Sequence, residues 1–490
     1  MIYLILFFTV LFFLLAWRRL DWAIMFLIIG LPTYLIRFNI FGLPSTFLEV
    51  MILIVFLVWA IKNFSRVKIN FLANFKKENK KIKIRYPFDW EIVLLLLIAF
   101  TAVGLAGFSS SSFGIFKAYF FEPVMLFIVV LNVIKGEKGR EKILWALAVS
   151  ALAVSALAIY QKITGDFINN PLWAAADTRR VVSFFGYPNA VGLYLGPIIL
   201  LMIGWFTSVV ARSPVLEATK QFLVKLRVRE IASFSSVARN DIVAVFFIGL
   251  VIAMSVLSIY FAKSKGALLG VAAGLVVFGL LVNKKIRWVT IIALILISLG
   301  VATYKPARDL AVENVTLTNL SGQIRKAGWI DTLKMLKDGR LLAGAGLANF
   351  QSTIAPYHTP GIFFKDFSDS DAQRKLVFNE AYRMAHWQPL EVYLYPHNIF
   401  LNFWSELGLA GMLLFIWIIG KFFVMGTRNL KTQKNRYIVI GLIGAMVVVV
   451  VHGLVDVPYF KNDLAMMFWL FVAMMSLINL ENKYGKDNIQ

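Results

Sequence analysis

Long apolar runs separated by short polar segments dominate the chain. An α-helix rises 1.5 Å per residue, so about 20 apolar residues cross about 30 Å of hydrocarbon. The pattern predicts an all-α polytopic membrane protein with about 12–13 transmembrane helices and one large extracytoplasmic loop. The thirteen candidate spans are residues 2–17, 21–37, 47–63, 89–107, 113–134, 142–161, 189–211, 241–262, 266–283, 288–304, 398–420, 437–457 and 463–480.

These spans divide the chain into four predicted parts. Ten spans fall within residues 1–304, and the large loop covers residues 305–397. Three further spans fall within residues 398–480, and residues 481–490 form a tail. The first span lacks a charged region before it and a small-residue cleavage site after it, so we expect it to stay as an anchor.

The charge distribution sets the expected orientation. The net charge of +23 could suggest nucleic-acid binding, but the basic residues gather in alternate loops, and thirteen spans place these loops on one side. That positive-inside pattern predicts an outside N-terminus and a cytoplasmic C-terminus, and it indicates attraction to anionic lipid and not to nucleic acid. The clusters are Arg18–Arg19, Lys62–Arg85, Lys135–Lys142, Arg212–Arg239, Lys284–Arg287, Lys421–Arg436 and the region near Lys483.

Two segments have a predicted surface role. Residues Arg66–Arg85 are basic and amphipathic, so we expect them to lie on the inner leaflet. The large loop opens with a predicted helix that Ser321 caps and Gly339 ends, with Arg325, Trp329, Leu333 and Leu336 on one face. After residues 344–350, about 40 residues show no clear period, and we expect them to form an irregular lid.

The stretch YPHNIFLNFWSELGLAG brings polar groups into an otherwise apolar span. His397 precedes the predicted helix, where the positive end of the helix dipole keeps an imidazole neutral and available as a base. Asn398, Asn402, Ser405 and Glu406 form a stripe running inward from it. Polar groups at membrane depth indicate either a water-accessible site or hydrogen bonds to neighbouring helices, and the sequence leaves both interpretations open.

Further polar groups fall on the predicted outer side. His452 and Asp456 are spaced i, i+4 and could hydrogen-bond each other, either to orient a substrate or as a structural pair at a helix end. Outside cations are unusual, and together with a neutral histidine they indicate an anionic ligand such as phosphate. These cations are Arg179, Arg180, Lys263, Lys265 and Arg325.

A metal site is the weaker alternative for the lid. Asp369 and Asp371 stand in a D-x-D spacing that could hold a divalent cation beside a phosphate, but acidic turns of this kind are far commoner than metal sites. The chain has no cysteine, so it has no disulfide, thiolate metal ligand or cysteine nucleophile.

These residues resemble the O-antigen ligase and polymerase family of bacterial envelope glycosyltransferases. The family's ligase signature is H-[NSQ]-x9-G-x-x-G-[GTY]. Here His397 and Asn398 are followed after nine residues by Gly408 and Gly411, while Met412 departs from the last position. Three other stretches are similar: Arg180 before Gly186, Pro188 and Asn189; Arg325 with Trp329, Gly344 and Gly346; and His452 with Asp456. A Ser-Arg-Gly turn of many relatives reads Ser264-Lys265-Gly266 here, which keeps the charge but loses the guanidinium fork.

The resemblance implies a metal-independent, GT-C-like enzyme without a cofactor. Such an enzyme takes a glycan from an undecaprenyl-diphosphate carrier to a glycolipid or glycan acceptor at the outer face of the inner membrane. His397 would act as the general base and Arg325 as the main cation facing the departing diphosphate. Attack opposite the leaving group predicts inversion at the sugar. Substrate contacts would come from Arg180, Lys265, Asn398, Trp329, His452 and Asp456.

Two alternatives remain open from the sequence. A polymerase would join lipid-linked repeat units, and the departure at Met412 leaves ligase and polymerase undecided. A transporter or flippase for a lipid-linked sugar would also need a polar path, but two similar halves with broken spans, its usual sign, are not evident. The identity of the glycan and the oligomeric state have no readable signal.

Overall fold

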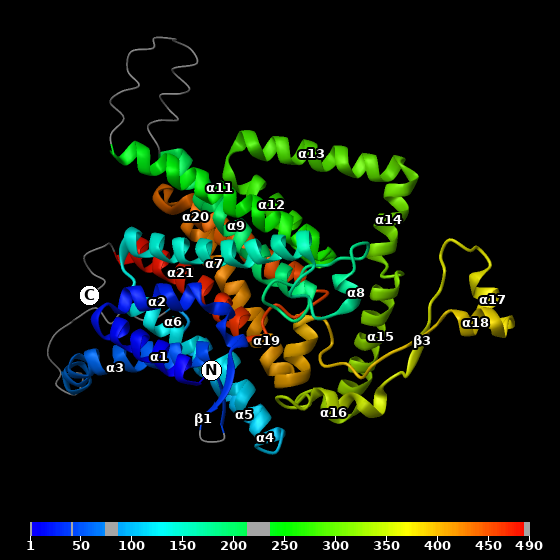
Figure 1. Cartoon of the computed structure of the whole chain (residues 1–490), viewed down its shortest axis with the longest axis horizontal. Helices are drawn as coiled ribbons and strands as arrows, with labels where there is room; N and C mark the ends of the chain where they lie inside the picture. Colours follow the sequence, from blue (N-terminus) through cyan, green and yellow to red (C-terminus); the bar gives the residue numbers. More distant parts are fainter. Residues whose placement is uncertain (1, 41–42, 74–86, 213–235, 485–490) are drawn as a thin grey trace, which may run out of the picture.

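The computed structural model describes residues 2–40, 43–73, 87–212 and 236–484, and helices account for most of them (Figure 1). The first part contains α1 (Ile2–Arg18), α2 (Leu20–Ile29), η1 (Leu31–Leu35), β1 (Arg37–Ile40), β2 (Leu43–Thr46), α3 (Phe47–Ala73), α4 (Asp89–Leu105), α5 (Ser110–Phe116), η2 (Lys117–Phe121), α6 (Glu122–Val133) and α7 (Gly136–Thr164). The middle part contains α8 (Pro171–Ala174), α9 (Pro188–Arg212), α11 (Ser236–Ala262), α12 (Lys265–Val282) and α13 (Lys284–Thr303).

The large loop and the last membrane helices complete the chain. The loop holds α14 (Lys305–Val315), α15 (Leu320–Met335), η4 (Leu336–Arg340), α16 (Phe350–Ile354), η5 (Ala355–Tyr357), β3 (Gly361–Phe363), α17 (Ala372–Phe378), α18 (Glu380–Ala385) and β4 (Trp387–Pro389). It extends to one side of the helix bundle in Figure 1. The last helices are α19 (Ile399–Asn429), η6 (Gln433–Asn435), α20 (Arg436–His452) and α21 (Asn462–Tyr484).

The prediction of an all-α polytopic membrane protein is confirmed. Every predicted span overlaps a helix over at least part of its length, and within the described residues eight helices are long and apolar enough to cross a membrane. The exact number of spans and the boundaries of the four parts remain predictions. The eight helices are Ser110–Val133, Gly136–Thr164, Pro188–Arg212, Asp241–Ala262, Lys265–Val282, Lys284–Thr303, Ile399–Asn429 and Asn462–Lys483.

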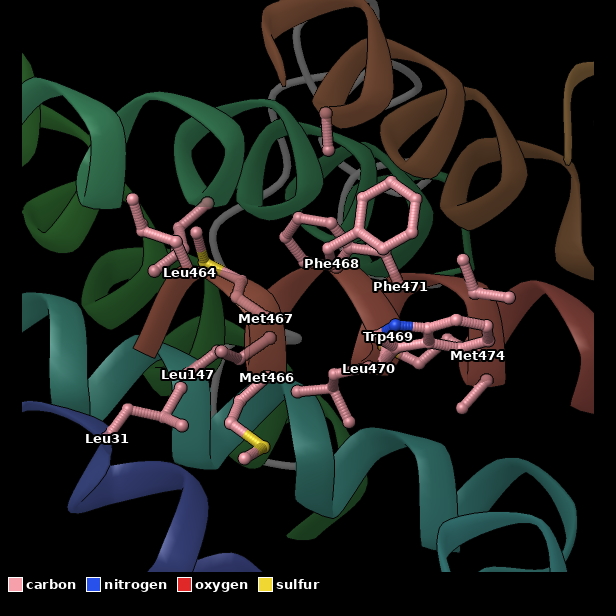
Figure 2. Close-up of a cluster of buried hydrophobic side chains, with 14 of the residues drawn as sticks. Leu31, Leu147, Leu464, Met466, Met467, Phe468, Trp469, Leu470, Phe471 and Met474 are labelled. Atoms are coloured by element: carbon pink, nitrogen blue, oxygen red, sulfur yellow. The ribbon is translucent and has the colours of Figure 1, made fainter. Parts of the chain in front are cut away.

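The core of the bundle surrounds α21. Figure 2 shows Leu464, Met467, Trp469 and Leu470 of α21 projecting in different directions among side chains that include Leu147 of α7. A helix that is apolar all round is expected to be buried. At the other extreme, α13 runs along the periphery and has no buried residue in its described length, as expected of a helix that faces lipid (Figure 1).

Two predicted spans are interrupted by their own sequence. The predicted span 21–37 is helical only to Ile29, because Gly30 and Pro32 turn the chain into the short 3-10 helix η1. The predicted span 398–420 extends to Asn429, but it bends sharply at Gly408, whose φ of 74° belongs to the left-handed region. The predicted amphipathic segment Arg66–Arg85 lies partly in the end of α3, and its residues 74–85 fall outside the described residues.

The predicted helix of the large loop is present, but its capping residue and its buried face differ from those predicted. Asn319, not Ser321, caps it by accepting a hydrogen bond from Gly322 N at 2.8 Å, and Gly339 with φ 76° ends the following turn as expected. The predicted apolar face is wrong in part, because Leu333 is exposed. The helix packs instead through the neighbouring stripe of Gly328, Asp331, Thr332 and Met335.

The rest of the loop is more ordered than predicted. Residues 350–389 form three short helices, a 3-10 turn and a two-stranded antiparallel sheet in which Gly361 pairs with Pro389 and Phe363 with Trp387. Elements of three to seven residues are too short to produce a readable period, which is why the sequence indicates only a lid. The loop also has a small core of its own, formed by Met335, Leu336, Ala345, Phe350, Ile354 and Tyr393.

Candidate active site

His397 stands at the junction between the large loop and α19. Its backbone is left-handed, with φ 49°, which is uncommon for a residue with a side chain and is often found at functional sites. Asn398 caps α19: its Oδ1 accepts hydrogen bonds from Phe400 N at 3.0 Å and Leu401 N at 3.1 Å, and its Nδ2 donates to Leu454 O at 3.1 Å. The cap therefore ties the start of α19, and with it His397, to the turn that follows α20.

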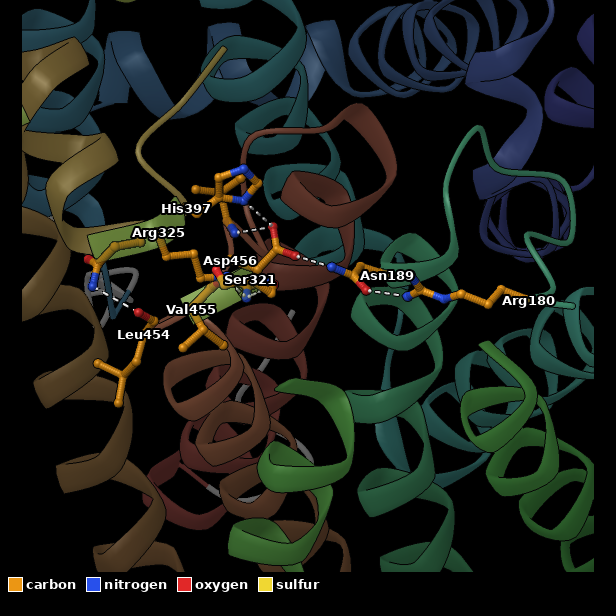
Figure 3. Close-up of polar contacts among 10 residues, drawn as sticks. Arg180, Asn189, Ser321, Arg325, His397, Leu454, Val455 and Asp456 are labelled. Carbon is orange, nitrogen blue, oxygen red and sulfur yellow. Dashed lines mark hydrogen bonds and ion pairs between the residues drawn. The ribbon is translucent and has the colours of Figure 1, made fainter. Parts of the chain in front are cut away.

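Asp456 lies in that turn and faces the imidazole (Figure 3). The distance from His397 Nδ1 to Asp456 Oδ1 is 3.9 Å, so the groups interact electrostatically without a direct hydrogen bond. The Asp456 side chain is 2% exposed and that of His397 is 33% exposed. Burial, together with the charge of Arg325, holds the pKa of His397 below its usual range although Asp456 opposes the shift. A lowered pKa favours the neutral form of the ring at neutral pH.

Arg325 reaches the same turn from α15. Its Nε donates to Val455 O at 2.8 Å, and its Nη1 donates to Ser321 Oγ at 2.6 Å. Ser321, which does not cap the helix, thus orients the guanidinium. Burial lowers the pKa of Arg325 from its usual range and Asp456 opposes that shift, and the guanidinium remains a cation. Two of its donor groups are occupied, and within the described residues its Nη2 has no hydrogen-bond partner.

Arg180 joins the group through Asn189. Arg180 Nη2 donates to Asn189 Oδ1 at 3.4 Å, and Asn189 Nδ2 donates to Asp456 Oδ2 at 3.3 Å (Figure 3). Both contacts are long for hydrogen bonds of this type and therefore weak. A firmer bond runs from Arg180 Nε to Ala262 O at 3.0 Å. His397, Asp456, Asn189, Arg180 and Arg325 thus converge at one end of the bundle, and we call these five residues the His397 cluster.

The neighbouring Arg179 behaves differently. Its guanidinium donates to three backbone carbonyls, those of Ala174, Lys162 and Ile163, at 3.0–3.1 Å. These bonds close the loop between α7 and α9. Two adjacent arginines therefore separate into a structural one, Arg179, and one that faces the His397 cluster, Arg180.

The remaining predicted site residues lie near the His397 cluster without a direct contact to it. His452 is buried at the end of α20, and among the described residues it makes no hydrogen bond to Asp456, because the helix ends before Asp456 and the i, i+4 spacing is lost. Lys265 is exposed and donates to Asn314 Oδ1 at 3.3 Å, while the adjacent Gly266 packs on the His452 ring. Trp329 lies one helical turn beyond Arg325, with a buried indole N–H that has no partner in the described part.

The inner part of the polar stripe holds the loop against α19. Glu406 Oε2 accepts a hydrogen bond from Ala348 N at 2.7 Å, and Ser405 O accepts one from Ala345 N at 2.6 Å. Leu409 N donates to the backbone oxygen of Leu342 at 3.1 Å across the bend at Gly408. The interpretation as a hydrogen bond to a neighbouring segment therefore describes the side chain of Glu406. The Ser405 hydroxyl donates within α19 to Asn402 O at 3.1 Å, and Ser405 contacts the loop through its backbone oxygen. At Gly408 the loop backbone packs directly against the helix.

Three residues near His397 are not predicted from the sequence: Tyr187, Tyr395 and Lys461. The Tyr395 ring meets the His397 ring edge-on at 4.7 Å, and it shares a hydrogen bond with Tyr187. Burial and Asp456 raise the pKa of Tyr395 to about 12, so it stays protonated. The Lys461 ammonium lies 4.4 Å from the Tyr187 ring centre. An aromatic–cation contact between distant segments has no fixed spacing, so the sequence holds no signal for this group.

The acidic pair in the lid is engaged locally. Asp369 accepts hydrogen bonds from Lys375 Nζ at 2.7 Å and from Tyr382 Oη at 3.4 Å. Across the described ranges, no three His, Cys, Asp or Glu side chains are grouped so that they could hold a metal ion.

Comparison with known families supports the resemblance. Residues 250–416 match the family model described as O-Antigen ligase, a third of the chain that includes Lys265, Arg325, Trp329, His397 and Asn398. Searching the curated proteins gives no match to the chain. Members of the family are membrane glycosyltransferase-type enzymes, and lipid-linked glycans are the substrates that the family suggests. Residues 250–416 thus carry an O-antigen ligase domain, which supports the assignment to the O-antigen ligase and polymerase family.

Proposed function

We propose that the chain transfers a glycan from an undecaprenyl-diphosphate carrier to an acceptor hydroxyl at the outer face of the bacterial inner membrane. The observation that carries the proposal is the convergence of a neutral imidazole, a buried carboxylate and two guanidinium groups in the His397 cluster. A metal-independent transfer needs these parts: a base for the acceptor and fixed cations for the leaving diphosphate.

The reaction can be written on these residues. The acceptor oxygen attacks the anomeric carbon of the donor sugar while its proton moves to His397. Because Nδ1 is buried toward Asp456, Nε2 is the nitrogen that receives it. The bond between the anomeric carbon and the diphosphate breaks, and its electron pair leaves with the diphosphate. Arg325, through its free Nη2, and Arg180 stabilise that charge, and attack from the opposite side inverts the anomeric centre.

Asp456 positions both partners of the reaction. It faces His397 on one side, and through Asn189 it reaches Arg180 on the other. When the imidazole gains a proton, the carboxylate stabilises the resulting cation at a distance of 3.9 Å. Lys265 lies at the start of α12 beside this region and adds positive charge for the anionic carrier.

The experiment that tests the proposal uses purified protein and a polyprenyl-diphosphate oligosaccharide, with products identified by mass spectrometry. Transfer to a glycolipid or glycan acceptor is the expected result, and EDTA should leave the rate unchanged. Growth of long chains on the carrier without another acceptor would establish the polymerase alternative. Loss of activity on chelation, restored by Mg²⁺ or Mn²⁺, would contradict metal independence.

A further inference from the structure

A second polar site lies at the same end of the bundle as the His397 cluster. It is a cavity of about 550 Å³, within the range of about 300–1,000 Å³ that small-molecule sites occupy. Its wall combines the β1–β2 hairpin, the start of α3, the segment from α5 to η2, and the start of α21. The lining residues that matter here are Arg37, Asn39, Glu49, Lys117, Tyr119 and Asn462.

The charges in this cavity leave one cation without a partner. Lys117 forms an ion pair with Glu49, so these two charges balance each other. Arg37 is exposed, and within the described residues its guanidinium makes no hydrogen bond or ion pair. A guanidinium of this kind is suited to a carboxylate or phosphate, which it can bind through two parallel hydrogen bonds.

The other groups in the wall are those that recognise sugars. The amides of Asn39 and Asn462 offer both donors and acceptors for sugar hydroxyls, and Tyr119 also lines the cavity. Lys117 and Tyr119 belong to η2, a π-helical turn, and single π-turns within helices are frequent at functional sites. The combination favours a hydroxyl-rich ligand that carries a negative charge.

A short segment connects the cavity to the His397 cluster. It begins at Asp456, which faces His397, and ends at Asn462, which lines the cavity. Tyr459, between them, donates from its hydroxyl to Tyr119 O at 2.8 Å and so fixes the segment to η2. Lys461, next to Asn462, lies over Tyr187, whose hydrogen-bond partner Tyr395 packs against His397.

We propose that this cavity binds an acidic oligosaccharide, which is the glycan part of the acceptor. The role as acceptor rests on the proposed transfer function, since a bound acceptor chain would extend along the Asp456–Asn462 segment toward His397. The binding itself follows from Arg37, Lys117, Glu49 and the two amides alone.

The experiment measures binding without requiring turnover. The probe is fluorescently labelled tetragalacturonate, which carries a carboxylate on every ring, so the register of binding need not be known. We expect saturable binding to the purified full chain, weakened about tenfold or more by Arg37→Ala, since a charge-assisted contact is lost. Arg308→Ala is the matched control, because Arg308 is an exposed arginine of α14 that does not line the cavity.

The location is tested by labelling. The chain has no cysteine, so Asn39→Cys introduces a single thiol at the cavity, and tetragalacturonate should protect it from a maleimide. Absence of saturable binding, or binding that Arg37→Ala and Arg308→Ala weaken equally, would overturn the proposal. Equal protection by inorganic phosphate would show a simple anion site and would overturn it too. Binding should persist in His397→Ala, so failure of transfer with intact binding would count against the proposed function only.

Discussion

The two ends of the polar stretch at the start of α19 look alike in sequence and differ in the structure. The outer end places His397 beside Asp456, with a third of its side chain exposed and its Nδ1 without a hydrogen-bond partner in the described part. The inner end buries Ser405 and Glu406 completely or nearly so and uses them to hold the backbone at Ala345 and Ala348. Polar groups in a membrane helix therefore indicate a candidate reactive site only where they are accessible from outside the membrane and are not already hydrogen-bonded.

Among the residues that surround His397, the largest effect is expected from removing the Arg325 charge. Arg325→Ala removes a fixed cation that faces the departing diphosphate, and we expect the transfer rate to fall by about 100- to 1,000-fold. Arg325→Lys keeps the charge but not the fork and should retain part of the activity. Arg179→Ala is the matched control: its guanidinium binds only backbone carbonyls, so the rate constant of correctly inserted protein should change little. Equal losses in Arg325→Ala and Arg179→Ala would contradict the separation of roles.

A smaller loss is expected at Asp456. Asp456→Asn preserves the shape but removes the charge that faces His397, so we expect about a tenfold lower rate, the equivalent of about 1.4 kcal/mol. His452, which is buried and does not contact Asp456 by a hydrogen bond in the described structure, should tolerate His452→Gln with a milder effect on rate. A transfer rate for Asp456→Asn equal to that of the wild type would show that the Asp456 charge does not contribute to the reaction.

The pH dependence of the transfer rate tests whether Asp456 and Arg325 act on the His397 base or only stabilise the fold. A base with a lowered pKa is neutral above that pKa, so activity should persist as the pH falls through 6.5 and be lost only below it. Because Asp456 raises the pKa of His397, Asp456→Asn should move this acid limb to lower pH. Because Arg325 lowers it, Arg325→Met should move the limb to higher pH in whatever activity remains. Both shifts of the acid limb are tested by initial transfer rates across pH 4.5–8, with the folded fraction of each variant measured at each pH.

The inner end of the stretch should affect stability and leave the chemistry alone. Glu406→Ala leaves the part-buried Ala348 N–H without its acceptor, so the free energy of unfolding should fall by about 1–3 kcal/mol. Glu406→Gln keeps an acceptor oxygen and should unfold close to the wild type. Thermal unfolding in detergent measures the stability of both variants. Loss of transfer in Glu406→Gln at unchanged stability would mean that the inner end takes part in the reaction.

The sequence predicts the architecture well because long apolar runs have few structural solutions. It also predicts His397, Arg325 and Asp456 as site residues, and the structure brings the three together around the turn after α20, while their roles in the reaction stay predictions. It does not identify Lys461 and Tyr187, whose contact joins segments far apart in the chain. Nor does it distinguish Arg179 from Arg180, or Glu406 from a reactive acid, since those roles depend on which backbone groups lie opposite each side chain.

The most direct test of the account compares His397→Ala with the wild type in single-turnover transfer from a polyprenyl-diphosphate oligosaccharide. General-base catalysis contributes about 100- to 10,000-fold, so the variant should bind the donor normally and transfer it slower by that factor. The inserted protein should unfold at the same temperature as the wild type. Transfer at the wild-type rate by His397→Ala would contradict the assignment of this imidazole as the base.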